Sequence, residues 1–533
     1  MPTQSTALVP KPLQLLLSLA VLALFSGIAF VNFYRVNLDS LAEPSRLIGY
    51  YLVVLAAAIV LSLIAKAAFR DAPISGILMV AAIATFMMFY YPEIKRLVGG
   101  DRPVLSIACW GLVTVLLAIV VGKFSDRKAF LPTMAMVGVI YLVPAVAGLI
   151  QARLHYPKLG NPVALPLTAR NRSNVYWIVL DGYPRADVLK QFFDFDDTPF
   201  LNSLRDLDFT VYDHAVASFP ETGFSISSTL SLGLLVNETG SPAKIPPMRD
   251  LAQRVRGRNV VVSTLRAMGY RYVHFQNGYD ELTQCPMEGA VCIRGNAGHW
   301  LQFDEFDLAL LSKTPLIDAI TLGNGLKIDE TPFARGAVSD LTDRLAEVQA
   351  HGAPFFLYGH ILAPHPPIRF RQDCSIRATD ADLQRWDATD KPAFLEQLAC
   401  VNREALDLVG KIVGRDPQAI VVVQSDHGTA FRGQFKLLRD DPDGHGETFR
   451  GQLAKPYDGW DDQDVKERFG ALNAIRMPAA CADEAAGTVD LVNTFARVLG
   501  CIAGHRLPDK TARLFVVSHA GDMTDVHEYK RDF

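Results

Sequence analysis

Five apolar stretches without a charged residue fill most of the first 152 positions, namely 12–34, 47–65, 72–92, 103–122 and 129–152. They contain 19 to 24 residues each, the length with which a helix crosses a hydrocarbon core of about 30 Å. Five such stretches in succession, joined by short polar loops, predict a transmembrane domain of five helices over 1–152. The first stretch is long for the core of a signal peptide, and we expect it to remain in the chain as a helix.

The pattern changes after residue 152. The polar, proline-containing segment 153–173 is typical of a juxtamembrane linker, and beyond it apolar runs rich in β-branched residues alternate with helical patterns. The strands are expected at 174–181, 209–213, 259–264, 270–275, 354–361, 418–425 and 513–518. The helices are expected near 185–206, 247–268, 336–350, 392–413 and 488–499. This alternation predicts an α/β domain over 174–533 with a mostly parallel central sheet.

Two of these strands end in carboxylates. The run 174–181 ends at Asp181, next to a glycine, and the run 418–425 leads directly into Asp426 and His427, again before a glycine. Continuous apolar runs indicate strands buried on both faces, and ligands gather at the carboxyl ends of parallel strands. Two carboxylates and an imidazole at one sheet edge therefore predict a metal site. The alternative is that each Asp-Gly or His-Gly pair is a simple turn after a strand.

The segment 217–229, between those two strands, is rich in hydroxyl groups and contains Ser218 and Thr222. At a helix N-terminus, free backbone N–H groups and the helix dipole favour an anion. A hydroxyl bound to a metal there would have a lowered pKa and could act as a nucleophile. The alternative is an ordinary Ser or Thr helix cap without chemistry.

A third segment, 354–367, is an apolar strand that breaks into a proline-rich loop and carries His360 and His365. An imidazole there can bind substrate oxygens or protonate a leaving group near neutral pH. We expect His360 and His365 to be catalytic, and His365 also to contact the substrate because its flanking prolines hold it away from the sheet. A structural role for either histidine is the alternative.

Cysteine and charge restrict the compartment and the partners. Cys109 lies in the fourth apolar stretch, and the other six cysteines form sequence-near pairs, Cys285/Cys292, Cys374/Cys400 and Cys481/Cys501. The pairs predict three disulfides in an extracytoplasmic domain, with buried thiols or a zinc site as alternatives. Lys and Arg in the loops are too evenly distributed to orient the helices. Residues 151–533 hold 41 basic and 50 acidic residues, a net charge of −9, which argues against nucleic-acid binding.

Taken together, the order Leu-Asp181-Gly, a hydroxyl nucleophile, Pro-His365-Pro-Pro and Ser-Asp426-His427-Gly resembles the alkaline phosphatase/sulfatase superfamily. The five apolar stretches resemble its membrane branch, which includes lipid A phosphoethanolamine transferases and lipoteichoic acid synthases. The resemblance implies one divalent metal ion (Zn, Mn, Mg or Ca) held by Asp181, Thr222, Asp426 and His427. It also implies that Thr222 is the nucleophile and that Ser218 contacts the substrate.

Three departures from the family pattern refine this expectation. Sulfatases with a formylglycine need Cys/Ser-x-Pro-x-Arg, and here Thr222 stands where Arg is required, which favours Thr222 over Ser218 as the nucleophile. No Asp lies between Pro354 and Arg369 to supply a second metal site, so one tightly bound ion is expected. Asp181 stands where the transferases usually have Glu.

The sequence thus predicts a multi-pass protein of the bacterial inner membrane with its catalytic domain in the periplasm. It would transfer or hydrolyse a phosphoric ester through a covalent Thr222 intermediate, on a lipid-linked or envelope glycan substrate. A sulfuric ester hydrolase of the same fold and a catalytically silent binding or sensor protein are the alternatives. No protein partner can be inferred.

Overall fold

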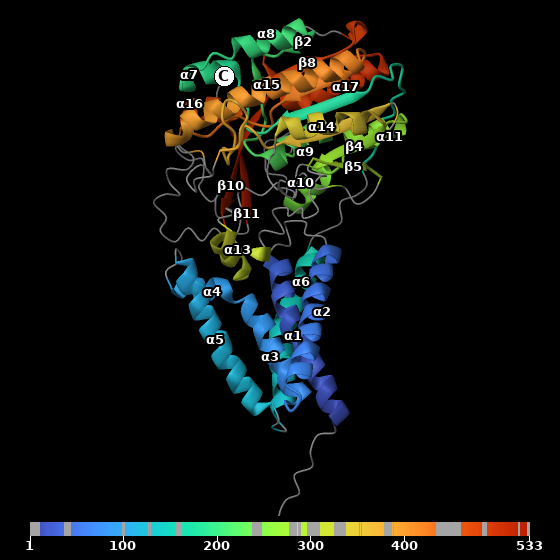
Figure 1. Ribbon diagram of the computed structural model, residues 1–533. Coiled ribbons are helices and arrows are strands. Elements are labelled where there is room, and N and C mark those ends of the chain that lie inside the picture. The colour runs from blue at the N-terminus through green and yellow to red at the C-terminus, as the bar shows by residue number, and fades with distance from the viewer. Residues whose placement is uncertain are drawn as a thin grey trace, which may run out of the picture. The chain divides into compact units, whose positions relative to one another are not determined.

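The computed structural model describes residues 11–36, 44–98, 102–125, 127, 129–155, 162–236, 248–276, 285, 289–295, 310–324, 337–350, 352, 354–377, 386, 388–432, 460–481, 488–520 and 523–529. The chain divides into two compact units (Figure 1). The membrane unit comprises Met1–Lys158 together with Glu305–Ile328. The other unit, which contains the predicted catalytic domain and which we call the catalytic unit, comprises Leu159–Asp304 and Asp329–Phe533. The second segment of the membrane unit is thus taken from the middle of the chain that forms the catalytic unit.

The membrane unit is helical. Its helices are α1 (Lys11–Val36), α2 (Pro44–Ala68), α3 (Ile74–Met88), α4 (Tyr91–Leu97), α5 (Pro103–Phe124), α6 (Phe130–His155) and α13 (Leu316–Asn324). Among the described residues, α1, α2, α5 and α6 are long and apolar enough to cross a membrane. The α3–α4 pair makes a fifth candidate that bends by 59°. The single helix predicted from stretch 72–92 is therefore two helices.

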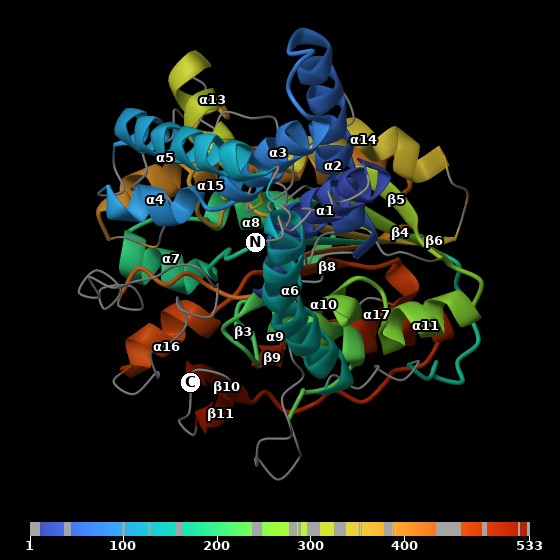
Figure 2. The same ribbon diagram turned by 90° about the horizontal axis from the view of Figure 1, so that it is seen from below.

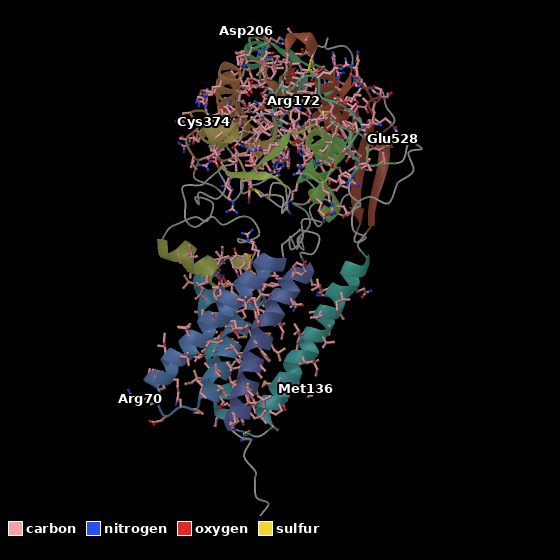
Figure 3. All side chains as sticks on the ribbon, turned by 90° about the vertical axis from the view of Figure 1, so that its right-hand side faces the viewer. Arg70, Met136, Arg172, Asp206, Cys374 and Glu528 are labelled. Carbon is pink, nitrogen blue, oxygen red and sulfur yellow. A yellow bond between two sulfur atoms is a disulfide. The ribbon has the colours of Figure 1, made fainter. Side chains whose placement is uncertain are left out.

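Exposed apolar side chains distinguish these helices from those of a soluble bundle. Met136 of α6, labelled in Figure 3, is 58% exposed, and Leu112 of α5 is 61% exposed. Such a surface is stable only against lipid. The boundaries predicted at 152 and 173 remain a prediction, and the structure has α6 ending at His155 and the first strand beginning at Val175.

A seven-stranded sheet forms the centre of the catalytic unit, in the order β2-β8-β7-β1-β6-β4-β5. The strands are β1 (Val175–Leu180), β2 (Phe209–Val211), β4 (Arg271–Gln276), β5 (Val291–Arg294), β6 (Phe355–Ile361), β7 (Ile420–Gln424) and β8 (Asn473–Arg476). β7, β1, β6, β4 and β5 are mutually parallel, and β8 is antiparallel to both of its neighbours. The mostly parallel sheet predicted from the sequence is confirmed. The predicted strand at 513–518 belongs instead to the separate hairpin of β10 (Leu514–Ala520) and β11 (Met523–Tyr529).

Helices cover both faces of the sheet (Figure 2). One face carries α7 (Ala186–Phe193), α8 (Thr198–Asp206), α14 (Val338–Ala350) and α15 (Lys391–Arg415). The other carries α9 (Thr222–Ser231), α10 (Met248–Val255), α11 (Val260–Ala267) and α17 (Thr494–Ala503). All residues of β1, β6 and β7 are buried, as expected for central strands enclosed between two helical layers.

The strand predicted at 259–264 is wrong. Three consecutive valines favour a strand, but the side chain of Asn259 accepts a hydrogen bond from the backbone N–H of Val262 and caps α11. The cap satisfies a backbone donor that a helix leaves unpaired at its start. Burial of Val261, Val262 and Leu265 then supports the helix that the overlapping prediction for 247–268 indicates.

Three disulfides connect segments of the catalytic unit. The structure joins Cys285 to Cys292, Cys374 to Cys400 and Cys481 to Cys501, with Cα–Cα distances of 5.7, 5.2 and 5.3 Å. These separations lie within the normal range for a disulfide. Cys109 in α5 is a free thiol.

Candidate functional site

The register of three neighbouring strands brings the predicted site residues to one sheet edge. β1 lies between β7 and β6, with Leu180 opposite Ile361 and Val179 opposite Gln424. The residues that follow β1 and β7 and the last residues of β6 therefore lie at the same carboxyl edge of the sheet. This is the position at which open α/β sheets bind ligands.

Asp181 leaves β1 at this edge. Its backbone N–H donates to the carbonyl of Ile361 at 3.0 Å, and its side chain is 1% exposed. Gly182 follows with φ +67°, and a Cβ there would lie 3.0 Å from the ring of Trp386. The glycine is required both for the positive φ and for the close approach of the indole.

Asp426 and His427 extend from β7. One carboxylate oxygen of Asp426, Oδ1, accepts hydrogen bonds from the backbone N–H groups of Gly182 and His427, both at 3.0 Å. His427 Nδ1 lies 2.9 Å from the carbonyl oxygen of Gly428 and donates to it. This hydrogen bond assigns the tautomer, so that the lone pair of Nε2 points to the centre of the site. Nε2 lies 3.3 Å from Asp426 Oδ2 and 3.6 Å from Asp181 Oδ1.

Thr222 is the first residue of α9, as the sequence predicts for a hydroxyl at a helix N-terminus. Its Oγ1 lies 3.3 Å from His427 Nε2. Ser225, one turn later, donates to the carbonyl oxygen of Asp426 at 2.6 Å and so links α9 to the loop after β7. The nucleophile candidate, the imidazole and the two carboxylates thus come from three different elements.

The two histidines of the β6 segment are placed differently. His360 lies within β6, is fully buried, and its Nε2 is 3.4 Å from Asp181 Oδ2. His365 lies in the following loop, half-buried, with its ring centroid 4.8 Å from that of Trp386 and 6.0 Å from that of His427. His360 therefore contacts a carboxylate, whereas His365 faces the centre from the loop side.

Electrostatics set the protonation states of these groups. Burial alone would raise the pKa of Asp181, but the neighbouring His365 and His360 overcome it and hold that pKa well below its ordinary value. Burial and the charge of Arg468 lower the pKa of His427 to about 4. At neutral pH the site therefore contains an ionised Asp181 and a neutral His427, the states in which these side chains bind a metal.

The donor atoms fit a divalent cation. Asp181 Oδ1 and Asp426 Oδ2 are buried and have no hydrogen-bond partner among the described atoms, an arrangement that is costly unless a cation neutralises it. The ligand atoms of Asp181, His365 and His427 lie within 4.8 Å of one another, as do those of Asp181, His360 and Asp426. The two groups share Asp181, so they adjoin one another at the same sheet edge.

Ser218 has a different environment from Thr222. Its side chain is 1% exposed, and its Oγ donates a short hydrogen bond to Asp490 Oδ2. Asp490 also accepts from the backbone N–H of Val492 at 3.0 Å. The Ser218 hydroxyl is therefore directed to a buried carboxylate at the start of the 3₁₀ turn Leu491–Asn493.

Sequence reasoning missed Arg468, which belongs to α16 (Asp462–Phe469). Its Nη1 donates to the carbonyl oxygen of Gly428 at 2.9 Å, and its Nη2 lies 3.4 Å from His427 Nε2. The neighbouring Glu467 accepts from Thr429, at 2.7 Å, and from two backbone N–H groups of the same loop. The sequence signal for α16 is the capping box of Asp461 and Asp464, but nothing in it points to His427.

The buried carboxyl of Asp197 predicts a pH effect on stability. Asp197 accepts hydrogen bonds from Tyr183, at 3.0 Å, and from Asn402, at 2.7 Å. Burial raises its pKa to about 7 in spite of these donors. Its pKa in the unfolded chain is about 3.9, so the folded state binds the proton more tightly. The contribution of Asp197 to stability therefore falls as pH rises from about 4 to about 7.

We expect Asp197→Asn to remove this loss of stability at higher pH, because the amide can keep the hydrogen bonds with Tyr183 and Asn402 without a buried charge. The thermal unfolding midpoint of the variant should rise relative to the parent between pH 5 and pH 8. Asp194→Asn is the matched control, since Asp194 carries the same charge but is 92% exposed and has a positive φ that Asn tolerates. An equal pH response of parent and Asp197→Asn would contradict the assignment.

One family model and several solved structures are similar to this chain. The family model described as Sulfatase matches residues 173–501, whereas no curated protein matches the chain. Among solved structures, lipooligosaccharide phosphoethanolamine transferase A (EptA) from Neisseria meningitidis is 13% identical with a TM-score of 0.42, covering 92% of this chain and 99% of that chain. The C-terminal periplasmic domain of EptC from Escherichia coli is 13% identical with a TM-score of 0.39, covering 69% and 97%. The phosphonate monoester hydrolase from Silicibacter pomeroyi is 14% identical with a TM-score of 0.38, covering 65% and 80%.

The match of the family model is the decisive finding. It begins just before β1, ends in α17, and so spans the sheet, α9 and all the site residues described above. Because it covers more than half of the chain, this membrane protein belongs to the sulfatase family.

Proposed function

We propose that this protein is a membrane-anchored, metal-dependent enzyme that transfers or hydrolyses a phosphoric ester on an envelope lipid or glycan. The observation that carries the proposal is the position of Thr222, whose Oγ1 lies 3.3 Å from His427 Nε2 at the N-terminus of α9. A hydroxyl so close to an imidazole and two ionisable carboxylates is placed for nucleophilic attack.

Asp181, Asp426, His427 and Thr222 would hold one divalent ion of the Zn, Mn, Mg or Ca class, since their donors are carboxylate oxygens, an imidazole nitrogen and a hydroxyl. When bound, the ion would keep the Thr222 hydroxyl ionised and stabilise charge on the transferred group. The fully buried His360 holds Asp181 in place through the contact at 3.4 Å.

The remaining residues bind and orient the substrate. The first backbone N–H groups of α9 are not used within the helix and can donate to oxygens of the transferred group. Arg468 Nη2, 3.4 Å from His427 Nε2, places a fixed positive charge beside the same group.

Thr222 Oγ, deprotonated, forms the new bond to phosphorus as the bond to the leaving oxygen breaks, and His365 in its imidazolium form donates its Nε2 proton to that oxygen. His365 Nδ1 donates to the carbonyl oxygen of Pro366, at 2.6 Å, which leaves Nε2 for this transfer. The oxygen of water or of an acceptor alcohol then attacks phosphorus, the bond to Thr222 Oγ breaks, and the proton of the attacking oxygen passes to His365 Nε2. The Ser218 hydroxyl donates to the buried Asp490, and we assign it no contact with the transferred group.

The proposal also places the catalytic unit in the periplasm, beside an inner-membrane domain of up to five spans. Three disulfides in that unit fit an oxidising compartment, where such bonds persist.

The test compares two chromogenic esters on the purified full-length protein loaded with metal. We expect release of nitrophenolate from a p-nitrophenyl phosphodiester to be faster than release from p-nitrophenyl sulfate. Protein recovered from its native envelope should also carry an adduct on the peptide that contains Thr222, and the mass of the adduct identifies the transferred group. Faster cleavage of the sulfate would establish the sulfatase alternative. Absence of both turnover and adduct would instead favour a binding or sensor protein.

A further inference from the structure

A short segment from the middle of the chain belongs to the membrane unit although the residues before and after it belong to the catalytic unit. The segment is Glu305–Ile328, and its described part is 310–324. A single connection after α6 would be enough to join the two units, so the chain has no need to return to the membrane unit at 305–328 for that purpose. The attachment of 310–324 to the membrane unit therefore needs a separate explanation.

Leu310 fixes the beginning of the described segment to the end of the helical bundle. Its side chain is 9% exposed and belongs to an apolar cluster with Phe30, Phe33, Tyr34 and Leu47. Those residues lie in the last two turns of α1 and the first turn of α2. Phe89 after α3 and Leu149 near the end of α6 pack against the same cluster. The segment is thus attached at the end of the bundle where α6 leaves it.

Asp318 fixes α13 to the same end. The hydroxyl of Tyr91 donates a short hydrogen bond to Asp318 Oδ2, and Lys95 Nζ lies 2.9 Å from each carboxylate oxygen. Tyr91 and Lys95 both belong to α4, and Asp318 is 8% exposed. A buried carboxylate paired with both a cation and a hydroxyl is a specific attachment, because leaving it unpaired would cost several kcal/mol. α13 also packs against α5 (Figure 1).

The opposite face of α13 is apolar and exposed. Leu316 and Ile320, one turn apart, are 44% and 37% exposed, and Ala319 between them is also exposed. The i and i+4 positions project on the same side of a helix. Asp318 is the only charged residue of α13, and it is turned toward α4. An apolar face of this kind is unfavourable in water.

The lipid bilayer is the partner that fits this face. α13 packs against α5, and the exposed apolar side chains of α5 begin at Val104 and Leu105 in its first turn. The exposed face of α13 continues that lipid-facing surface beyond the end of the span. Helices with one apolar face that lie at this level insert about 5–10 Å into the boundary of head groups and acyl chains.

We propose that 310–324 is an interfacial membrane anchor of the catalytic unit. Leu310 and Asp318 attach it to the end of the bundle, and Leu316, Ala319 and Ile320 enter the adjacent leaflet of phospholipid. The chain that carries the catalytic sheet is thereby fastened to the membrane at a second point besides α6. This role does not depend on the reaction that the site performs.

The test places a fluorescent NBD label at Leu316→Cys or Ile320→Cys of the full-length protein in the Cys109→Ser background, so that the label has one free thiol. The protein is reconstituted in phosphatidylethanolamine/phosphatidylglycerol vesicles that contain a lipid quencher with a doxyl group near the head group. Leu112→Cys on α5 is the lipid-exposed control. Asp206→Cys, at an exposed site of α8 labelled in Figure 3, is the water-exposed control.

Quenching by the doxyl lipid at 316 and 320 should exceed that at 206 by at least about twofold, and quenching by aqueous iodide should be correspondingly weaker. Asp318→Leu in the Leu316→Cys chain should reduce the doxyl quenching, because α13 loses its attachment to α4. Iodide quenching equal to that at 206 would show that the face lies in water and overturn the proposal. Protection from both quenchers would show that protein covers it, either a second copy or the catalytic unit, and would overturn the proposal as well.

Discussion

Thr222→Ala is expected to lower kcat by about four to six orders of magnitude, as removal of a covalent nucleophile does in other enzymes. Thr222 Oγ1 is the hydroxyl that lies 3.3 Å from His427 Nε2, and the variant leaves no oxygen at that position. The backbone N–H groups of α9 remain, so weak cleavage by water can persist. The measurement is single-turnover and steady-state release of nitrophenolate, together with mass spectrometry of the peptide that contains residue 222.

Two variants control this experiment. Thr222→Ser keeps the hydroxyl and should retain adduct formation at a reduced rate. Ser218→Ala removes the donor to Asp490 and should only lower the rate, because that hydroxyl is directed away to a carboxylate. The thermal unfolding midpoint of both Thr222 variants should stay close to that of the parent, and so should their metal content at saturating metal, because Asp181, Asp426 and His427 remain. Ser218→Ala should unfold at a lower temperature, because it leaves the buried Asp490 without that donor. Substantial turnover by Thr222→Ala, or an adduct on Ser218, would reverse the assignment of the two hydroxyls.

The local pattern of the sequence predicts the sheet edge well because two signals agree there. A continuous apolar run identifies β1 and β7 as central strands, and a polar residue immediately after such a strand lies at its carboxyl end. Asp181, Asp426 and His427 follow from this argument alone. Gly428 is required for a reason that the local sequence does not show. A Cβ at this position would lie 2.1 Å from the carbonyl oxygen of Glu467, which is distant in sequence.

Contacts between distant segments are what the sequence does not predict. Arg468 reaches His427 from a helix about 40 positions later in the chain, and its sequence neighbours give no sign of that contact. The apolar residues of 316–322 are too few to suggest a membrane span, so the sequence alone does not predict that the chain returns to the membrane unit. The valines after Asn259 show the opposite case, in which one capping side chain outweighs the strand propensity of the residues that follow.

We expect Asp426→Asn to weaken metal binding without preventing folding. The variant should be less stable than the parent when metal is bound and more stable than the parent when metal is removed. Oδ1 of Asp426 accepts from two backbone N–H groups, and an amide oxygen can take over both. Oδ2 lies 3.3 Å from His427 Nε2, and the amide NH₂ of Asn can donate to the lone pair of that nitrogen. The variant thus leaves only one of these two carboxylates without a hydrogen-bond partner among the described residues, whereas the parent brings together two buried carboxylate oxygens that lack one.

With metal present, the parent should be the more stable protein, since a ligand at about 100 times its Kd contributes about 2.7 kcal/mol. After chelation the order should reverse, with Asp426→Asn unfolding at the higher temperature. Metal affinity of the variant should fall by at least about 100-fold, and turnover should fall with it. Asp407→Asn is the matched control, because Asp407 pairs with Lys411 on the surface of α15 and should not respond to metal. If the chelated parent remained as stable as the chelated variant, Asp181 and Asp426 would not form a cation site, and the metal-dependent mechanism would lose its structural basis.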